Sequence, residues 1–297
     1  MTQIASAEQD TLQRFIFENA PIRGELVHLD SSWRTVLSHH DYPVPVQKLL
    51  GEMMAASALL VSTLKFEGTL TIQFQGSGPI SLMVMEASNQ RAIRGIAHWQ
   101  GEIADGSLKT LLGNGTLAIT IDPAKQGERY QGIVEITGET LAESLEHYLT
   151  HSEQLDTHIW LAADDQQASG MMLQRMPGDL SDENREDWDR ATALAATIRT
   201  QELLELPVKE LLHRLFHEEV LRLFDAEPVC FRCSCSRERV GGMLKSLGID
   251  QIHAIIDDEG SIEVGCEFCN QKYSFDKVDA EELFAAEIKI QPPRQTQ

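Results

Sequence analysis

The chain is poor in basic residues, with 25 lysines and arginines against 46 aspartates and glutamates, and its formal net charge is −21 at pH 7. So acidic a protein repels a phosphate backbone, which argues against nucleic acid as its main partner. Long apolar runs are also missing. The longest mostly apolar run, residues 53–64, is too short to cross a membrane. It predicts a buried helix, and no membrane partner is expected.

An export signal is missing too, because the first residues, MTQIASAEQDTLQRFIFENAP, show no basic flank followed by an apolar block. We therefore expect a reducing, cytoplasmic location, where disulfides do not persist. Cysteine is scarce, with five residues in 297, yet four of the five stand in two tight pairs. This pattern indicates metal or redox chemistry rather than a disulfide scaffold.

Motifs of nucleotide binding and hydrolysis are absent. The stretches GSGP and GNGT match neither a P-loop nor a dinucleotide fingerprint, and no G-x-S-x-G elbow occurs. His213 and His217 are one helical turn apart but lack a third ligand, so a solvated helix face is the favoured interpretation. A loop before YPVP explains His39, His40 and Asp41 better than acid–base chemistry does. The chain is therefore expected not to be an enzyme.

Residues 1–177 have the pattern of an N-terminal α+β domain. Apolar and polar residues alternate in short segments joined by glycine-rich turns, which favours a mostly antiparallel sheet over a parallel doubly wound one. The expected strands are 69–76, 80–87, 91–99, 115–123 and 130–137, the last two as a hairpin. Helices are expected at 45–64 and 139–152.

A helical linker is expected at 178–229, after a Pro-Gly break. Six acidic residues lie between Asp179 and Asp189, where carboxylates suit the positive end of a helix dipole, and Ser181 is a candidate N-cap. Two amphipathic helices are predicted, and their apolar stripes need cover from the first domain and the C-terminal module. The stripes are Trp188, Ala191, Leu194, Ala195 and Ile198, and then, after Pro207, Val208, Leu211, Leu212, Leu215, Phe216, Val220 and Leu223.

A small C-terminal module is expected at 230–287, followed by a tail at 288–297. Its cysteines lie in VCFRCSCSRE and GCEFCNQ, as a C-x-C pair and a C-x-x-C pair with thirty residues between them. Two such pairs are typical of a tetrahedral all-sulfur site for Zn²⁺, and Asn270 suits the positive φ that follows such a knuckle. We predict one Zn²⁺ per chain, in the reduced state, on Cys233, Cys235, Cys266 and Cys269.

A purely structural zinc site is the simplest interpretation of this spacing, but two observations favour redox chemistry. A C-x-C pair is unusual beside a C-x-x-C knuckle, and Arg232, Arg237 and Arg239 flank it, where positive charge stabilises thiolates. Thiolates released from zinc react readily with an oxidant. A module of ~55 residues has a marginal core, and structural zinc supplies on the order of 10–16 kcal/mol of folding free energy. Oxidation of the sulfurs is therefore expected to melt the module.

The cysteine motifs resemble those of the redox-regulated heat-shock chaperones, the thirty-three-kilodalton heat-shock protein family of the bacterial cytosol. FRCSCSRERV and GCEFCNQKYSF are similar to that family's zinc module. The likeness covers nearly the whole chain and extends to residues 23–29, 51–76, 130–157 and 173–178.

This resemblance implies an ATP-independent holdase that binds unfolding client proteins under oxidative stress. The reduced, zinc-bound form is then expected to be an inactive monomer. Oxidation is expected to release zinc and to form two disulfides, Cys233–Cys235 and Cys266–Cys269. The linker then loses its order, apolar client-binding surface is exposed, and the active form is a homodimer.

Cys230 departs from the four-cysteine pattern of that family. It creates a Cys230-x-x-Cys233 spacing, so it could replace Cys235 as a ligand, stand outside the site as an extra thiol, or divert oxidation into a Cys230–Cys233 disulfide. The extra-thiol interpretation is favoured, because Cys233 and Cys235 match the pair of the family.

Two other classes of protein remain as alternatives. A thiol–disulfide oxidoreductase would use Cys266 and Cys269, but thioredoxin-like motifs lie beside a βαβ pattern that this sequence does not show. A zinc-ribbon module for nucleic acid is disfavoured by the acidic charge. Turnover of a disulfide substrate distinguishes the oxidoreductase from a holdase, which is expected to show none.

Overall fold

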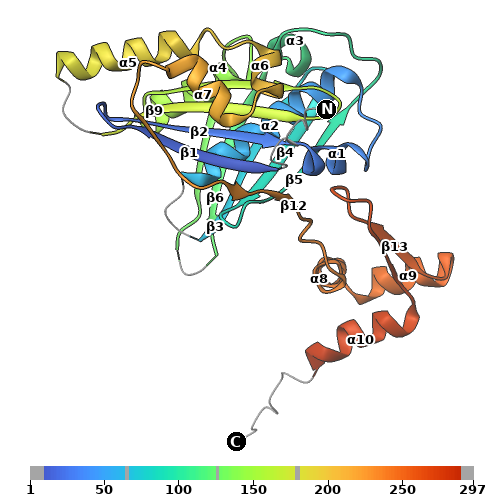
Figure 1. Cartoon of the computed structure of the whole chain (residues 1–297). Helices are drawn as coiled ribbons and strands as arrows, with labels where there is room; N and C mark the ends of the chain where they lie inside the picture. Colours follow the sequence, from blue (N-terminus) through green and yellow to red (C-terminus); the bar gives the residue numbers. More distant parts are fainter. Residues whose placement is uncertain (1–9, 64–66, 125–126, 178–180, 289–297) are drawn as a thin grey trace, which may run out of the picture. The chain divides into compact units, whose positions relative to one another are not determined.

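Two sheets of short strands form the frame of residues 10–232 in the computed structural model (Figure 1). The structure describes residues 10–63, 67–124, 127–177 and 181–288. The strands of the first sheet are, in spatial order, β10 (Leu221–Leu223), β1 (Thr11–Phe17), β2 (Ile22–Leu29), β9 (Ala168–Arg175) and β8 (Thr157–Ala163), with β11 (Glu227–Pro228) also on β1. Those of the second are β12 (Cys230–Phe231), β5 (Ala92–Trp99), β4 (Ile80–Ser88), β3 (Gly68–Gly76), β6 (Gly115–Pro123) and β7 (Tyr130–Glu135).

The predicted α+β class and the five predicted strands are confirmed. The expected strands correspond to β3, β4, β5, β6 and β7, and β6 pairs with β7 as an antiparallel hairpin. Residues 125–126 of its turn lie outside the described residues. Among the described strand pairs, β12 with β5 is parallel and the others are antiparallel. The strands of the first sheet were not predicted.

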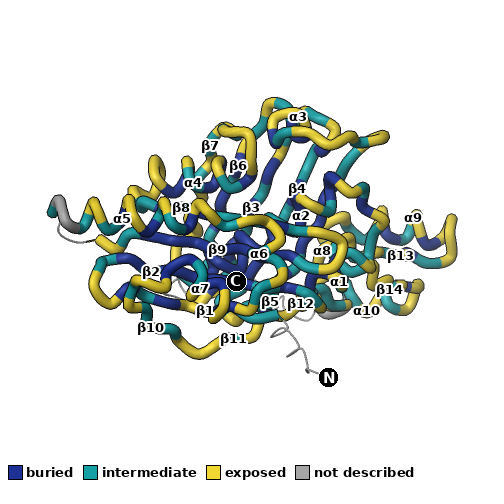
Figure 2. Tube along the Cα trace, turned by 45° about the horizontal axis from the view of Figure 1, so that its top comes forward, coloured by how far each residue is buried: buried dark blue, intermediate teal, exposed yellow. Residues whose placement is uncertain are grey.

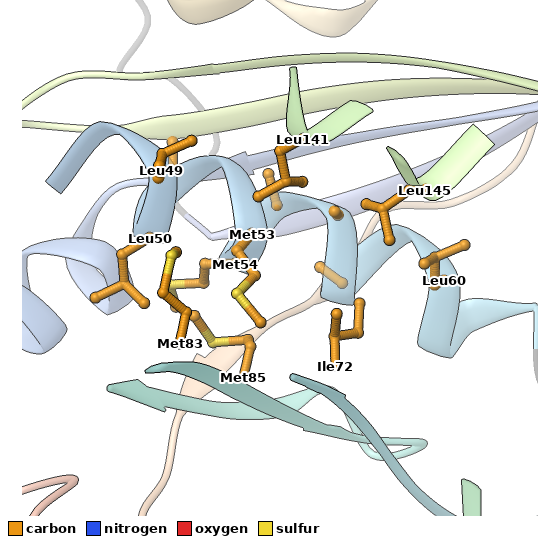
Figure 3. Close-up of a cluster of buried hydrophobic side chains, with 14 of the residues drawn as sticks. Leu49, Leu50, Met53, Met54, Leu60, Ile72, Met83, Met85, Leu141 and Leu145 are labelled. Atoms are coloured by element: carbon orange, nitrogen blue, oxygen red, sulfur yellow. The ribbon is translucent and has the colours of Figure 1, made fainter. Parts of the chain in front are cut away.

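Helix α2 (Val44–Ser62) forms the centre of the main core, because it packs against strands of both sheets. Figure 3 shows its leucines and methionines between Ile72, Met83 and Met85 of the second sheet and two leucines of α4 (Leu141–Ser152). By length and hydropathy α2 could cross a membrane, but 78% of its most apolar window is buried inside the protein. It is therefore the core helix that the sequence predicted at 45–64.

A capping box in the sequence sets the start of helix α4. Thr140 and Glu143 form a reciprocal capping box, in which each side chain accepts from the other residue's backbone N–H. This arrangement satisfies two donors at the helix start. Leu141, Leu145 and Tyr148 then face the core, and the predicted helix at 139–152 is confirmed. Two short helices, α1 (Ser31–Leu37) and α3 (Leu108–Leu112), complete the frame.

The linker segment packs on the first sheet through a second apolar core. Helices α5 (Asp182–Ala195), α6 (Thr200–Glu205) and α7 (Val208–Phe216) bury a common stripe against side chains of β1, β2, β8 and β9. Figure 2 shows the buried stretches of β2 and β9 running beneath this segment. Ser181 accepts a hydrogen bond from the Asn184 N–H at 3.3 Å, so the expected N-cap is confirmed. The observed cover of the predicted stripes therefore comes from the sheet.

Two details of the linker prediction are wrong. The first helix ends at Ala195 and a separate α6 follows it. The second helix ends at Phe216, after which Val220 is 57% exposed and Leu223 lies in β10, opposite Phe15 of β1. Pairing with β1 at the edge of the first sheet supplies the backbone partners of this segment in place of another helical turn. Asp179 lies outside the described residues.

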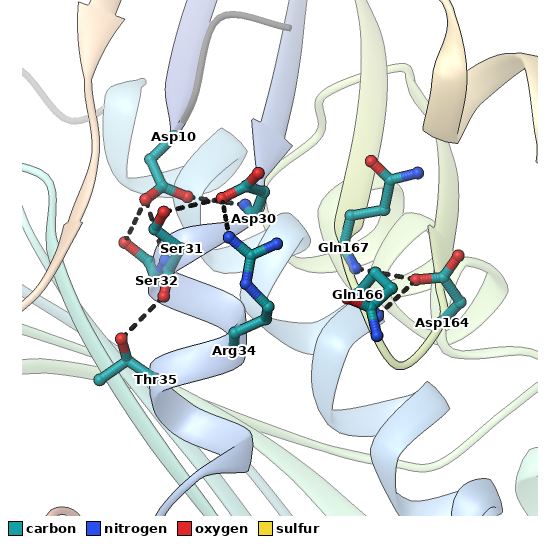
Figure 4. Close-up of polar contacts among 9 residues, drawn as sticks. All are labelled: Asp10, Asp30, Ser31, Ser32, Arg34, Thr35, Asp164, Gln166 and Gln167. Atoms are coloured by element: carbon teal, nitrogen blue, oxygen red, sulfur yellow. Dashed lines mark hydrogen bonds and ion pairs between the residues drawn. The ribbon is translucent and has the colours of Figure 1, made fainter. Parts of the chain in front are cut away.

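A network around Asp10 anchors the last strand before the cysteines (Figure 4). The Asp10 carboxylate accepts from the backbone N–H groups of Asp30 and Ser32, at 2.7 and 2.9 Å, and from the Ser32 hydroxyl at 3.0 Å. The Ser32 Oγ in turn accepts from the Phe231 N–H at 2.9 Å. The backbone of β12 is thereby held two residues before Cys233.

The chain divides into two compact units, residues 1–232 and 233–297. The second unit contains α8 (Arg237–Leu247), α9 (Ile249–Glu259), a hairpin of β13 (Ile262–Gly265) and β14 (Lys272–Phe275), and α10 (Lys277–Ile288). Its core is small, with the buried apolar residues Leu244, Ile252, Ile256, Ile262, Phe275 and Ala280. Such a core gives a unit of this size little stability of its own.

Candidate metal centre

Two loops of the second unit carry the paired cysteines. Cys233 and Cys235 lie in the extended segment that precedes α8, whose N-cap Ser236 accepts from the Arg239 N–H at 3.2 Å. Cys266 and Cys269 lie in the turn between β13 and β14. A helix start and a hairpin turn thus fix the two pairs locally.

The hairpin turn has the conformation that was expected of a zinc knuckle. Asn270 has φ of 54°, the left-handed conformation that asparagine tolerates better than most residues. The Cys266 carbonyl accepts from the Asn270 N–H at 2.8 Å and from the Cys269 N–H at 3.3 Å, and the Cys266 N–H donates to the Gln271 carbonyl at 2.9 Å. These bonds close the turn and point both thiols of the pair to one side.

The structure brings the four predicted sulfur atoms together. All four Sγ atoms lie within 4.8 Å of one another. The Sγ of Cys233 is 3.6 Å from that of Cys266, and the Sγ of Cys235 is 3.4 Å from that of Cys269. A tetrahedral zinc ion with Zn–S bonds of about 2.3 Å places its sulfurs about 3.8 Å apart. The cluster therefore has the ligand type, number and spacing of a site that could hold a metal ion.

Thiols this close cannot all ionise without a cation between them. Burial, together with hydrogen bonding from neighbouring thiols, raises the pKa of Cys266 and of Cys269 above the usual thiol value. The ligands of a soft metal are thiolates, so binding of such an ion would displace these protons. A cation bound between the sulfurs would favour their thiolate forms and offset the cost of ionising neighbouring thiols.

Tyr273 is a neighbour of the cluster that the sequence did not point to. Its hydroxyl donates a hydrogen bond to the Cys235 Sγ at 3.1 Å, and this bond is the main reason why the pKa of Tyr273 rises to about 12. Metal-binding side chains are usually oriented by such outer hydrogen bonds. Tyr273 is on β14, so the hairpin that carries one cysteine pair also steadies a sulfur of the other pair.

The arginines that flank the first pair are held mainly by oxygen atoms. Arg237 forms an ion pair with Asp279 at 2.6 Å and lies over the ring of Phe275, with its guanidinium carbon 4.2 Å from the ring centroid. Arg239 donates to the carbonyl and the hydroxyl of Ser234, at 2.9 and 2.5 Å. The Arg239 contacts hold the loop between Cys233 and Cys235, and the Arg237 contacts join the start of α8 to Phe275 and Asp279. Stabilisation of the thiolates by these arginines stays a prediction.

Cys230 does not belong to the group of four clustered cysteines. It is exposed, belongs to the first unit, and pairs with Ala92 as part of β12. Its backbone N–H donates to the Arg91 carbonyl at 3.0 Å. None of the five cysteines forms a disulfide in this structure. The histidine pair considered in the sequence, His213 and His217, is exposed, with His213 in α7 and His217 at its C-cap.

Comparison with known proteins gives a consistent result. The family model described as "Hsp33 protein" matches residues 10–276. The chain is 50% identical over 281 residues to the 33 kDa chaperonin of Nitrosococcus oceani, covering 95% of this chain and 96% of the relative. It is 49% identical to the 33 kDa chaperonin of Shewanella loihica, with 93% and 96% covered.

A solved structure has the same fold. The crystal structure of the 33 kDa chaperonin, or heat shock protein 33 homolog, from Thermotoga maritima superposes with a TM-score of 0.82 at 20% identity, covering 94% of this chain and 99% of that one. The family model and the curated relatives span nearly the whole length of the sequence. The chain belongs to the Hsp33 family of chaperones.

Proposed function

We propose that this chaperone is a redox-regulated, ATP-independent holdase that binds unfolding proteins under oxidative stress. In the proposed resting state the chain is a reduced cytoplasmic monomer with one Zn²⁺ held by Cys233, Cys235, Cys266 and Cys269. The ion supplies folding free energy to the second unit and takes no part in catalysis. The observation that carries the proposal is the four-thiol cluster in a unit with only six buried apolar residues in its described core.

In the proposed activation, an oxidant converts the four thiols into two disulfides, Cys233–Cys235 and Cys266–Cys269. Each disulfide forms as two zinc-bound thiolates lose two electrons, and one hydrogen peroxide per disulfide takes up these electrons and two protons from solvent to become two waters. A disulfide sulfur is no longer a thiolate ligand, so zinc is released. A unit with this small a core then loses its main source of stability.

The client-binding surface is proposed to come from the linker at 178–229. Its helices bury large apolar side chains, among them Trp188, Leu211 and Phe216, against the first sheet. Chain continuity links the two events, because β10, β11 and β12 connect α7 directly to Cys233. Those strands are short, and their pairs with β1 and β5 involve two or three residues each. Unfolding of the second unit would remove support from this connection, and opening of the linker would expose apolar surface and permit dimerisation.

The oxidoreductase alternative receives little support from the position of Cys266 and Cys269. A reactive C-x-x-C pair gains a low thiol pKa at the start of a helix. Here the pair lies in a hairpin turn, and the pKa of both thiols is raised. Cys230 is proposed to be an extra thiol without a role in the zinc site.

The proposal is tested with a denatured client protein whose aggregation is followed by light scattering. The reduced, zinc-loaded protein and the peroxide-treated protein are compared with and without ATP. We expect suppression only after oxidation, with no effect of ATP. Suppression that requires ATP would refute the holdase, and turnover of a disulfide substrate would favour the oxidoreductase.

A further inference from the structure

A second group of metal-binding side chains lies in the first unit. A pocket of about 390 Å³ is lined by α4, the start of β8 and the linker helix α5. It contains three histidines, with His147 and His151 from α4 and His158 from β8, and Trp188 of α5 forms another part of its lining. Figure 2 shows α4 and β8 side by side in this part of the molecule. The function proposed above uses none of the three histidines.

The carboxylates of this pocket already have partners. Glu143 belongs to the capping box of α4, and Asp156 forms an ion pair with Arg175. Glu146 accepts from the Ile159 N–H at 2.6 Å through one oxygen and lies 3.4 Å from the His158 Nδ1 through the other. The imidazoles are therefore the side chains best placed to act as new ligands.

Two of the imidazoles have the spacing of a chelating pair on a helix. His147 and His151 are four residues apart on α4, one helical turn, and their rings stack with centroids 4.0 Å apart. The His151 Nδ1 is 2.9 Å from the His147 carbonyl. A carbonyl only accepts, so Nδ1 carries the proton and the neutral ring presents a lone pair on Nε2. Both side chains are exposed, so small rotations that open the stack toward an ion cost little.

His158 has the outer hydrogen bond that is typical of a metal ligand. Its Nδ1 faces the Glu146 carboxylate, and Glu146 is itself fixed by the Ile159 N–H. This carboxylate–histidine arrangement sets the tautomer that leaves Nε2 available to a metal. The His158 ring also stacks on Trp188, with centroids 5.7 Å apart, which restricts its orientation.

We propose that His147, His151 and His158 form a second metal site, for a divalent late transition metal such as Zn²⁺. Imidazole ligands select zinc, copper and nickel over magnesium and calcium. In the described part of the chain, the four cysteines are the one group of three or more ligands whose atoms already lie within 4.8 Å of one another. The histidine site therefore closes by side-chain rotation when the ion binds, which makes it the weaker of the two sites.

Calorimetry with Zn²⁺ on the full-length protein tests the site. The reduced protein is first loaded with one equivalent of Zn²⁺ to fill the cysteine cluster, and further Zn²⁺ is then titrated. We expect one additional saturable equivalent in the wild type. The His147→Ala/His151→Ala variant should lose it, while His158→Ala and Glu146→Gln should weaken it roughly tenfold or more. Glutamine keeps an oxygen for the Ile159 N–H, so the fold of this segment is retained.

The matched control is His213→Ala/His217→Ala, which removes an exposed histidine pair of the same spacing at the C-terminal end of α7. Its rings are 6.1 Å apart and T-shaped, and it should leave the additional equivalent unchanged. The absence of a second equivalent in the wild type would overturn the proposal. So would unchanged affinity in His147→Ala/His151→Ala or in His158→Ala, or loss of the equivalent in the control. None of these results depends on chaperone activity, so they leave the proposed function untouched.

Discussion

Leu211→Ala is the change that most sharply tests the role of the linker. The Leu211 side chain is fully buried in the core between α5–α7 and the first sheet. Truncation of a buried leucine to alanine costs about 2–5 kcal/mol, and the value depends on how far the site collapses. Because about 1.4 kcal/mol corresponds to a factor of ten, the open form of the linker should become at least ~30-fold more populated.

The expected result is a linker that opens without oxidation. The variant should retain one Zn²⁺ and four reduced cluster thiols, since Leu211 belongs to the first unit and the cluster to the second. Amide exchange over 182–216 should accelerate at least ~30-fold, in line with the larger population of the open linker. Under reducing conditions the variant should already suppress part of the aggregation of a denatured client in light scattering.

Two control variants separate this effect from general destabilisation. His213→Ala changes an exposed position of the same helix and should behave as the wild type. Leu145→Ala creates a cavity in the main core around α2, where Leu145 is also fully buried, and should lower stability without selective exchange in the linker. The reasoning would be refuted if Leu211→Ala loosened the linker but remained inactive until oxidised, or if Leu145→Ala were equally active.

Three further outcomes are expected. Cys230→Ser should leave the zinc content at one ion per chain, whereas Cys266→Ser should abolish tight zinc binding. Atomic absorption measures the zinc content of both variants. Loss of zinc in Cys230→Ser would show that the ligand assignment is wrong. A strong chelator should unfold residues 233–288 while the first unit stays folded. Circular dichroism and amide exchange measure this, and a second unit that stays folded in the chelator would contradict the expectation. Burial raises the pKa of Glu25 from 4.5 to about 7, so the folded protein keeps a proton that the unfolded chain releases between these values. The unfolding free energy should therefore fall by on the order of 3 kcal/mol as pH rises through this window. Glu25→Gln should flatten the dependence of the unfolding free energy on pH, measured by urea titrations at each pH. An unchanged pH dependence would show that Glu25 is not its source.

The strands β3 to β7 of the second sheet were predictable because one face of each is more exposed than the other. β3 alternates buried and less buried positions from Gly68 to Phe74, and its sequence shows the same alternation. In β2 and β9, by contrast, most positions are buried on both faces. The main core covers one face and α5–α7 cover the other, so no period of two remains in the sequence.

The end of the linker was mispredicted for a related reason. Val220 and Leu223 continue the helical spacing of α7, yet Leu223 pairs with Phe15, more than 200 residues away. Local periodicity carries no information on such a partner. The cysteine pairs were predictable because a knuckle is a local structure, and the φ of Asn270 follows from it. Two contacts depend instead on how the two cysteine-bearing loops meet, so local sequence patterns do not give their geometry. They are the hydrogen bond of Tyr273 to Cys235 and the short distance between the sulfurs of Cys233 and Cys266.

In the proposed switch, zinc release, thiol oxidation and client holding are one event. The most direct measurement takes a single reduced, zinc-loaded sample through a graded peroxide series. At each step it determines bound zinc, free thiols and suppression of client aggregation on the same aliquots. Suppression is expected to rise in proportion to the zinc released, as four thiols per chain are consumed. Full suppression by the reduced, zinc-loaded protein, or complete zinc release without any suppression, would contradict it.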